Sequence, residues 1–174
     1  MWATTFLCII FFIGSFLFHL PNYSSNGSIK ESATYAISDN IIQINESESD
    51  FLDDGHTISL GNVVANRNGL FGDNIVVNLY KSDESQVRIE KEISASGNSR
   101  SEAKKIAGNT SISENINGNI ISIPEVYRIS KGNKYRGQRV TYSIYIPKNK
   151  EVEIDKNMYW TIWKNEFKRE KNKK

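Results

Sequence analysis

The sequence predicts a mainly β protein, in which an N-terminal transmembrane helix is followed by a β-solenoid- or sandwich-like domain with one short helix. Three observations support this class. The 174 residues, enough for one domain and an appendage, begin with a long apolar run. After residue 20 the chain has 20 Ile and 8 Val but only 4 Leu, and β-branched side chains favour strands. Apolar and polar residues alternate in several later segments, as in strands with one buried face.

Residues 2–20 are predicted to form a transmembrane helix. Fourteen of these 19 residues are apolar and none is charged. As a helix the segment would extend about 28 Å, which nearly matches a hydrocarbon core of about 30 Å. A cleaved secretory signal is the competing interpretation, but the segment has neither a basic start nor a small-residue cleavage pattern. We therefore expect a single-pass anchor in the cell membrane, with an orientation that the sparse nearby Lys and Arg do not define.

Residues 21–56 are predicted to be an acidic polar linker. They contain seven acidic residues and only one basic residue, Lys30, and they are rich in Ser and Asn. This composition is typical of a solvated spacer. The isoleucines between positions 37 and 44 could form one short strand within it.

Residues 57–158 are predicted to form the β-rich domain. Val87, Ile89 and Ile93 alternate with charged residues, which is the period of a half-buried strand. Asn-Gly supplies the positive φ angles of a tight hairpin turn. A short helix is expected at 101–107, with Ser99 or Ser101 as its N-cap and Gly108-Asn109 at its end. The expected strands are 75–80, 86–93, 139–146, a hairpin of 112–116 and 120–123, and a strand around residues 152–154.

Residues 159–174 are predicted to be an aromatic and basic C-terminal tail. Tyr159, Trp160, Trp163 and Phe167 are spaced as on one side of a helix. Such a helix could lie in a membrane interface. We favour its docking onto the β domain, with the final lysines frayed.

Composition and motifs exclude several kinds of chemistry. One cysteine cannot form an internal disulfide or a cysteine-cluster zinc site, and a net charge of +2 does not indicate nucleic-acid binding. Asp53, Asp54 and His56 are the best metal-like group, but neighbouring ligands in an Asp-Gly turn do not readily converge on one ion. The nucleophile-elbow, zinc-protease, Walker and calcium-loop motifs are also missing from the sequence. We therefore expect no enzyme activity, cofactor or metal.

Two groups of charged residues remain as candidate sites. Glu90 and Glu92 share a strand face and could imitate a glycosidase pair, although carboxylates on an exposed face usually only solvate it. A basic loop could bind a phosphate or a lipid headgroup, stack single-stranded nucleic acid, or contact a protein partner. The competing interpretation, which we favour, is a polar hairpin loop without a ligand. The residues of this loop are Lys131, Lys134, Tyr135, Arg136 and Arg139.

Several stretches resemble the C-terminal region of phage shock protein C-type membrane proteins of Bacteroidetes-like bacteria. The matching stretches are SASGNSRSEAKKIAGNTSIS (94–113), NGNIISI (117–123), KYRGQRVTYSIYIP (134–147) and EIDKNM (153–158). The resemblance implies a toastrack-like β domain at residues 57–158, tethered to the inner membrane on its extracytoplasmic (periplasmic) side. It also implies a setting in envelope-stress signalling and no catalytic residues. The cytoplasmic module and most membrane helices of those proteins have no counterpart here.

We therefore expect a membrane-anchored, non-catalytic domain that binds or senses at the cell envelope. It would oligomerise or recognise a protein partner through its β surface and edge strands. An adhesin-like surface domain that contacts glycans or cells is the alternative. A small hydrolase that uses Glu90 and Glu92 is the third hypothesis, and the one we favour least.

Overall fold

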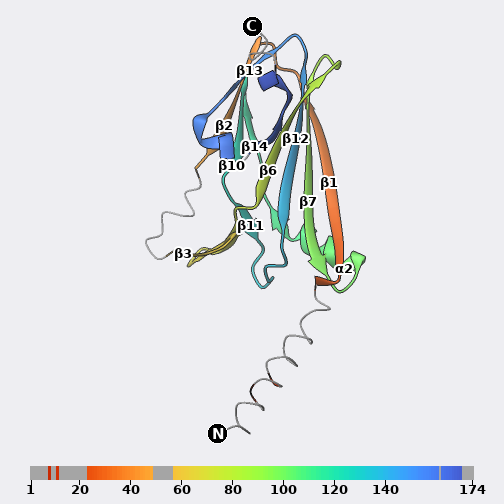
Figure 1. The fold of residues 1–174 in the computed structure, drawn as a ribbon, viewed down its shortest axis with the longest axis vertical. Helices are drawn as coiled ribbons and strands as arrows, with labels where there is room; N and C mark the ends of the chain where they lie inside the picture. Colours follow the sequence, from red (N-terminus) through yellow and green to blue (C-terminus); the bar gives the residue numbers. More distant parts are fainter. Residues whose placement is uncertain (1–7, 9–10, 12–22, 49–56, 161, 170–174) are drawn as a thin grey trace.

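The computed structural model of the chain describes residues 8, 11, 23–48, 57–160 and 162–169. Between residues 23 and 169 the described chain has one α-helix, α2 (Arg100–Gly108), and two 3-10 helices (Lys156–Trp160 and Glu166–Arg169). Its strands form three sheets (Figure 1). The predicted fold class, mainly β with one short helix, is confirmed for this part of the chain.

The first sheet contains the longest strands, in the order β1-β7-β12-β6-β14. β7 is antiparallel to β1 and β12, whereas β12 and β14 are both parallel to β6. The three central strands confirm those predicted at 86–93, 139–146 and 75–80. The bounds are β1 (Ser25–Tyr35), β7 (Val87–Gly97), β12 (Arg139–Pro147), β6 (Ile75–Ser82) and β14 (Ile162–Asn165).

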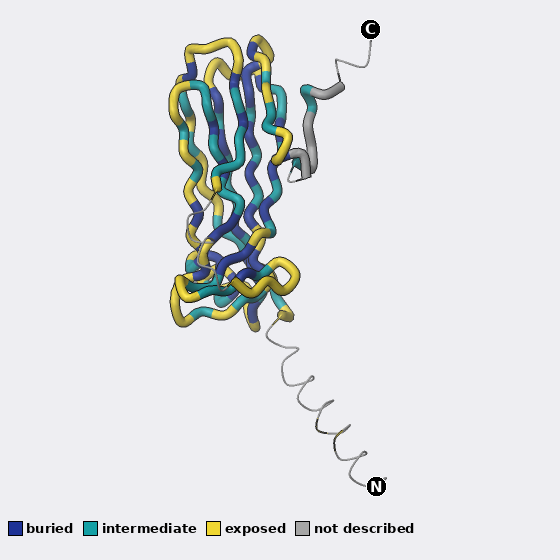
Figure 2. The backbone as a smooth tube through the Cα atoms, turned by 90° about the vertical axis from the view of Figure 1, so that its left-hand side faces the viewer, coloured by how far each residue is buried: buried dark blue, intermediate teal, exposed yellow. Residues whose placement is uncertain are grey.

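The second sheet packs face to face on the first, which makes the domain a sandwich. A single buried cluster contains Val77 and Tyr142 from the first sheet together with Ile44 and Ile121 from the second. All four are fully buried, and the buried stretches run along the strands between the two layers (Figure 2). This sheet has the order β13 (Glu151–Ile154), β2 (Ile41–Ser47), β10 (Ile120–Pro124) and β9 (Asn115–Asn117).

The predicted Asn-Gly hairpin is formed by β9 and β10. Ile120 pairs with Asn117, so the turn consists of Gly118 and Asn119. Gly118 has a φ of +61°, in the region that favours glycine. The first strand begins at Asn115 rather than at the predicted residue 112, and the 3-residue length of β9 reflects that late start.

A third, smaller sheet closes one end of the sandwich, at the bottom of Figure 1. Tyr127 joins it to the main core, because this fully buried residue belongs to the same apolar cluster as the two larger sheets. Its ring occupies the space beside Gly72 on the paired strand β5, where an added Cβ would lie 2.3 Å from the ring. This sheet has the order β3 (Ile58–Leu60), β4 (Val63–Asn66), β5 (Gly69–Gly72), β11 (Tyr127–Ile129) and β8 (Thr110–Ser111).

The prediction of a spacer is wrong for two parts of residues 21–56. β1 pairs with β7 along its whole length, from Ser25 opposite Gly97 to Tyr35 opposite Val87. Polar side chains conceal this strand in the sequence. It is held by the ladder with β7, by ion pairs across that ladder, and by packing of Ile29 and Tyr35 against the main core. β2 lies between β10 and β13 and buries Ile42 and Ile44, as the short-strand alternative expected.

The predicted tail helix is also wrong, although the tail does dock on the β domain. β14 adds to the edge of β6, and a 3-10 helix follows it. Ile162 and Phe167 pack against the main core, so an edge of exposed backbone groups and an apolar contact favour the extended form here. The side chains of Tyr159, Trp160 and Trp163 lie outside the described part.

The predicted anchor at residues 2–20 lies outside the described residues except for Cys8 and Phe11. Among the helices that the structure describes, none has the length and apolar character needed to cross a bilayer. β1 begins at the end of the sandwich where α2 and the third sheet lie, and β13 lies at the opposite end (Figure 1).

Candidate functional site

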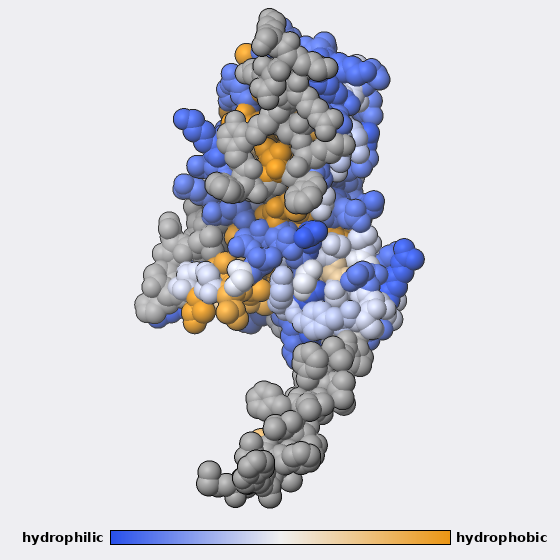
Figure 3. All heavy atoms as spheres, in the orientation of Figure 1, coloured by the Kyte–Doolittle hydropathy of each residue, from blue (hydrophilic) through white to orange (hydrophobic). Residues whose placement is uncertain are grey.

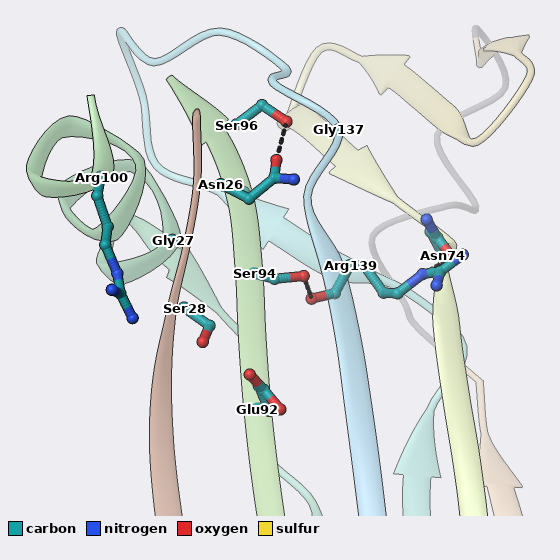
Figure 4. Close-up of a pocket in the computed structure, with 11 residues that line it drawn as sticks. Asn26, Gly27, Ser28, Asn74, Glu92, Ser94, Ser96, Arg100, Gly137 and Arg139 are labelled. Atoms are coloured by element: carbon teal, nitrogen blue, oxygen red, sulfur yellow. Dashed lines mark hydrogen bonds between the residues drawn. The ribbon is translucent and has the colours of Figure 1, made fainter. Parts of the chain in front are cut away.

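A polar recess of about 620 Å³ opens on the outer face of the first sheet, near the start of β1 (Figure 4). Ser28 and Ser94 are paired across β1 and β7, and Ser94 is paired with Arg139 of β12. The short side chains of Ser28 and Ser94 leave the space of the recess open. One row further along, the Ser96 hydroxyl donates a 3.0 Å hydrogen bond to Asn26 Oδ1.

Glycines allow α2 to pack against the other face of the same strands. A Cβ added at Gly27 would lie 2.8 Å from the Arg100 carbonyl oxygen, and one at Gly97 would lie 2.8 Å from the Ala103 nitrogen. The helix buries Ala103 and Ala107 and is capped by Ser99, whose hydroxyl accepts a hydrogen bond from the Glu102 nitrogen. The predicted helix and its N-cap are therefore confirmed.

This packing places Arg100 at the recess. Figure 4 shows its side chain on one side of the serines and Arg139 on the other, where Arg139 Nε donates to Asn74 Oδ1 at 3.3 Å. Glu92 also lines the recess, and its carboxylate is 3.2 Å from Lys30 Nζ. Hydroxyl, amide and guanidinium groups of this kind can bind polar or anionic ligands reversibly. The two histidines of the chain lie outside the described residues, so no described histidine can serve as a general base here.

The basic loop between β11 and β12 is held at both ends. At its start, the Ser130 nitrogen and hydroxyl both donate to the Asn109 carbonyl oxygen, at 2.9 and 2.8 Å. At its end, Gln138 is fully buried, and its Oε1 accepts a 2.7 Å hydrogen bond from the Arg136 nitrogen. Tyr127 donates to the Gln138 carbonyl oxygen at 2.6 Å, and burial raises the pKa of Tyr127 well above that of an ordinary tyrosine.

The five predicted residues of this loop do not line one common recess. Arg139 lines the recess described above, whereas Lys131 lines a smaller one, of about 320 Å³, beside the β4–β5 turn. Arg136 lies over the Tyr23 ring, 5.3 Å from its centroid, and Tyr135 packs partly against the main core. Lys134 is exposed. Burial raises the pKa of Tyr135.

A charged network that the sequence analysis missed lies on the inner side of β7. Lys91 Nζ is 3.0 Å from Glu31 and 3.5 Å from Glu114, and the Tyr142 hydroxyl donates to Glu114 at 3.2 Å. Burial alone would lower the pKa of Lys91, but the hydrogen bond to Glu31 and the charge of Glu114 raise it above the ordinary lysine value. Burial, followed by the charge of Glu114, raises the pKa of Tyr142.

The outer face of β7 and its neighbours carries a second row of contacts. Arg88 lies 3.9 Å from the centroid of Tyr145, which stacks on Tyr80 at 5.0 Å. Arg88 also forms ion pairs with Glu84 and Glu90. Glu90 and Glu92, considered as a hydrolase pair, therefore each have a cationic partner.

An acidic group lies where the second and third sheets meet. Burial raises the pKa of Glu46, and the nearby charges of Glu125 and Asp155 raise it further. The described residues hold no group of three or more His, Cys, Asp or Glu side chains placed to bind a metal ion. Asp53, Asp54 and His56 lie outside the described part.

The missed residues differ in how far the sequence could have revealed them. Lys91 occupies the inward position between Ile89 and Ile93, so a charge on the apolar face of a predicted strand was a visible signal. The positions of its partner Glu31 in the network and of Arg100 at the recess depend on which strands and helix are neighbours in the fold. No local sequence pattern indicates those neighbours.

Comparison with known proteins adds three findings. No curated protein matches the chain. A crystal structure of a candidate adhesin from Parabacteroides merdae is similar at 11% identity and a TM-score of 0.32; the similarity covers 74% of this chain and 34% of that protein, so the chain spans about a third of its length.

A family model, described as the ToastRack found in some PspC, matches residues 64–174. This matched range includes all three central strands of the first sheet, the helix α2 and the basic loop. The resemblance seen in the sequence is thereby confirmed, and the chain belongs to the family of toastrack domains found in some PspC proteins.

Proposed function

We propose that the chain is a membrane-anchored, non-catalytic domain that binds at the cell envelope, on the extracytoplasmic side, in an envelope-stress setting. Edge strand β1 is the binding element, and a protein partner or a second copy of the chain is the ligand. Family membership supports the setting, since PspC proteins are membrane-associated.

The length of β1 as an edge strand is the observation that carries this proposal. Six strands lie at the sheet edges in the described chain. Five of them are two to four residues long, whereas β1 has 11 residues. Short edge strands are one way in which proteins avoid unwanted pairing. A long edge strand offers a row of backbone donors and acceptors to an added strand.

Charged side chains do not block this edge. Lys30 and Glu31 lie near the middle of β1, where charges could repel an added strand. Lys30 is paired with Glu92 and Glu31 with Lys91, and both partners belong to β7. The two side chains are therefore directed across the sheet rather than over its open side.

A photo-crosslinking residue at Ser32 tests the proposal in membranes that contain the full chain. We expect a covalent product of higher mass from position 32, and none from the same residue at the exposed Ser85 in the β6–β7 turn. The mass of the product distinguishes a second copy from another protein. Equal yields at both positions would count against the proposal.

Two proline variants make this test specific for backbone pairing. In an antiparallel strand, neighbouring residues present their N–H groups alternately to the paired strand and to the open side. One of Ser32→Pro and Ala33→Pro should therefore break the β1–β7 ladder and lower the melting temperature. The other should preserve the fold and abolish the crosslink. Because the proline lies at or next to position 32, the photo-crosslinking residue is placed at Ser28 in both proline variants. A fold-preserving proline that retains full crosslinking contradicts edge pairing.

Glycan contact is a second candidate function, and the recess in Figure 4 is the observation that favours it. Its hydroxyl, amide and guanidinium groups match the hydroxyl and acidic groups of sugars. A glycan array with the full chain tests this function. Binding that Arg139→Ala reduces would support it, and the absence of any bound glycan would contradict it.

A further inference from the structure

One end of the domain must lie close to the bilayer if residues 2–20 are the anchor, so this inference rests on the proposed function. Only four residues, 21–24, separate that segment from β1. Four extended residues span at most about 14 Å. The end at which β1 begins, with α2 and the third sheet, is therefore held near the lipid headgroups (Figure 1).

This end carries more basic than acidic residues. The described segments that form it, 57–74, 97–111 and 124–139, contain nine basic and three acidic residues, and Glu46 of β2 lies beside Glu125. The turns at the opposite end, 35–41, 82–86 and 147–151, contain two basic and four acidic residues. The modest net charge of the whole chain conceals this separation. A positive surface facing a bilayer is attracted to anionic headgroups within about one Debye length.

Exposed apolar side chains accompany the positive charge. Ile58 and Leu60 of β3 are 74% and 81% exposed. Figure 3 shows apolar atoms at the lower edge of the domain, in the region of the small sheet. Basic residues beside exposed aliphatic groups are the combination with which peripheral proteins bind bilayer interfaces.

The basic loop is fixed in place before any contact. Its backbone is bound by Asn109, Ser96 and the buried Gln138, and Asn109 Nδ2 donates to Asn133 Oδ1 at 3.0 Å. Lys131 and Lys134 remain exposed on this fixed loop. Binding through them therefore orders side chains only and not the loop backbone.

We propose that this end of the domain docks on the surface of the bilayer that holds its own anchor. Lys131 and Lys134 contact anionic phospholipid headgroups, and Ile58 enters the interface. The domain then stands upright on the membrane, with β1 extending away from it and accessible along its open edge.

Depth-dependent quenching in proteoliposomes tests the docking. The full chain carries Cys8→Ser and Ile58→Cys, with an apolar environment-sensitive dye on the new cysteine. Vesicles contain phosphatidylcholine with about one third phosphatidylglycerol, and a nitroxide lipid serves as quencher. We expect strong quenching at position 58. A dye at Ser85→Cys should not be quenched, because the 11 residues of β1 and β7 separate the two ends by about 35 Å.

Two further comparisons test whether basic residues and anionic headgroups hold the docked domain. Omission of phosphatidylglycerol should reduce quenching at position 58. Lys131→Glu should raise the ratio of undocked to docked domains about tenfold, because it removes one positive charge and adds a negative one. Lys148→Glu, an equal charge change at the opposite end, should have no effect.

Carbonate-washed vesicles separate the two possible failures. A chain that does not float with the vesicles contradicts the anchor and hence the proposed function. A chain that floats but shows equal quenching at positions 58 and 85 overturns the docking alone. Quenching at position 58 that is insensitive both to phosphatidylglycerol and to Lys131→Glu also overturns it.

Discussion

Lys91 is a charged residue in the otherwise apolar inward row of strand β7. Its side chain is 12% exposed and occupies a position that the alternation reserves for apolar residues. Burial of an ammonium group is unfavourable unless partners compensate for it, and Glu31 and Glu114 supply that compensation. The polar network thus fixes β1 and the segment before β9 on β7.

Replacement of Lys91 by methionine should lower the free energy of unfolding by about 2 kcal/mol, because it leaves the mostly buried Glu114 carboxylate without its cation. Lys30→Met is the matched control, since the Lys30–Glu92 pair is mostly exposed and should contribute under about 1 kcal/mol. Urea unfolding of the full chain measures both. Equal effects of the two variants would contradict a structural role for the network.

Glu46 gives a pH-dependent prediction. Because its folded-state pKa is raised, the folded state binds the proton more tightly than the unfolded state does. That contribution is complete below the unfolded pKa of about 4.3 and is lost as the pH rises through the folded pKa. Glu46→Gln should therefore match the wild type near pH 3.5 and melt at a higher temperature at pH 7.

The control for Glu46 is Glu48→Gln, which removes one negative charge from an exposed position two residues away. The pH-dependent difference from the wild type should be larger for Glu46→Gln than for Glu48→Gln. A Glu46→Gln variant that melts below the wild type at pH 7 would show that the carboxylate stabilises the fold.

At the scale of elements, close packing of α2 on β1 and β7 places Arg100 at the recess and Asn109 against the start of the basic loop. The helix approaches so closely because Gly27 and Gly97 have no side chains. Gly97→Ala should lower the free energy of unfolding by about 1–3 kcal/mol, since the new Cβ meets the Ala103 backbone.

Gly108→Ala is the control for Gly97→Ala. Gly108 lies in the same helix, and an added Cβ meets nothing within 4 Å. The substitution should be neutral or slightly stabilising. Thermal unfolding followed by circular dichroism measures both, and an equal loss in the two variants would mean that the helix does not rest on these strands.

The elements also show what the sequence could predict. The strands around Val87, Ile144 and Val77 were predicted because each buries a regular apolar face. β1 was missed because Gly27 and the charged Glu31 interrupt the row of residues that faces inward. Its pairing with β7 also depends on partners 52 to 72 residues away. The aromatic spacing of the tail predicted a helix, but the open edge of β6 gave residues 162–165, in the middle of this segment, a strand partner.

At the scale of the whole molecule, the charge separation and the long edge strand belong to one arrangement. The basic end carries the first residues of β1, next to the predicted anchor, and the open side of β1 runs away from it for 11 residues. The candidate basic residues were identified from the sequence. Their division between two recesses was not predictable, because the turn around Arg67 meets the loop only in three dimensions.

Whether the chain is an anchored extracytoplasmic domain is tested by a reporter fused after Lys174, combined with carbonate extraction of membranes. We expect a full-length chain that resists extraction and a reporter that is active only outside the cytoplasm. A shortened product released in soluble form, or a reporter active in the cytoplasm, would contradict an anchored extracytoplasmic domain.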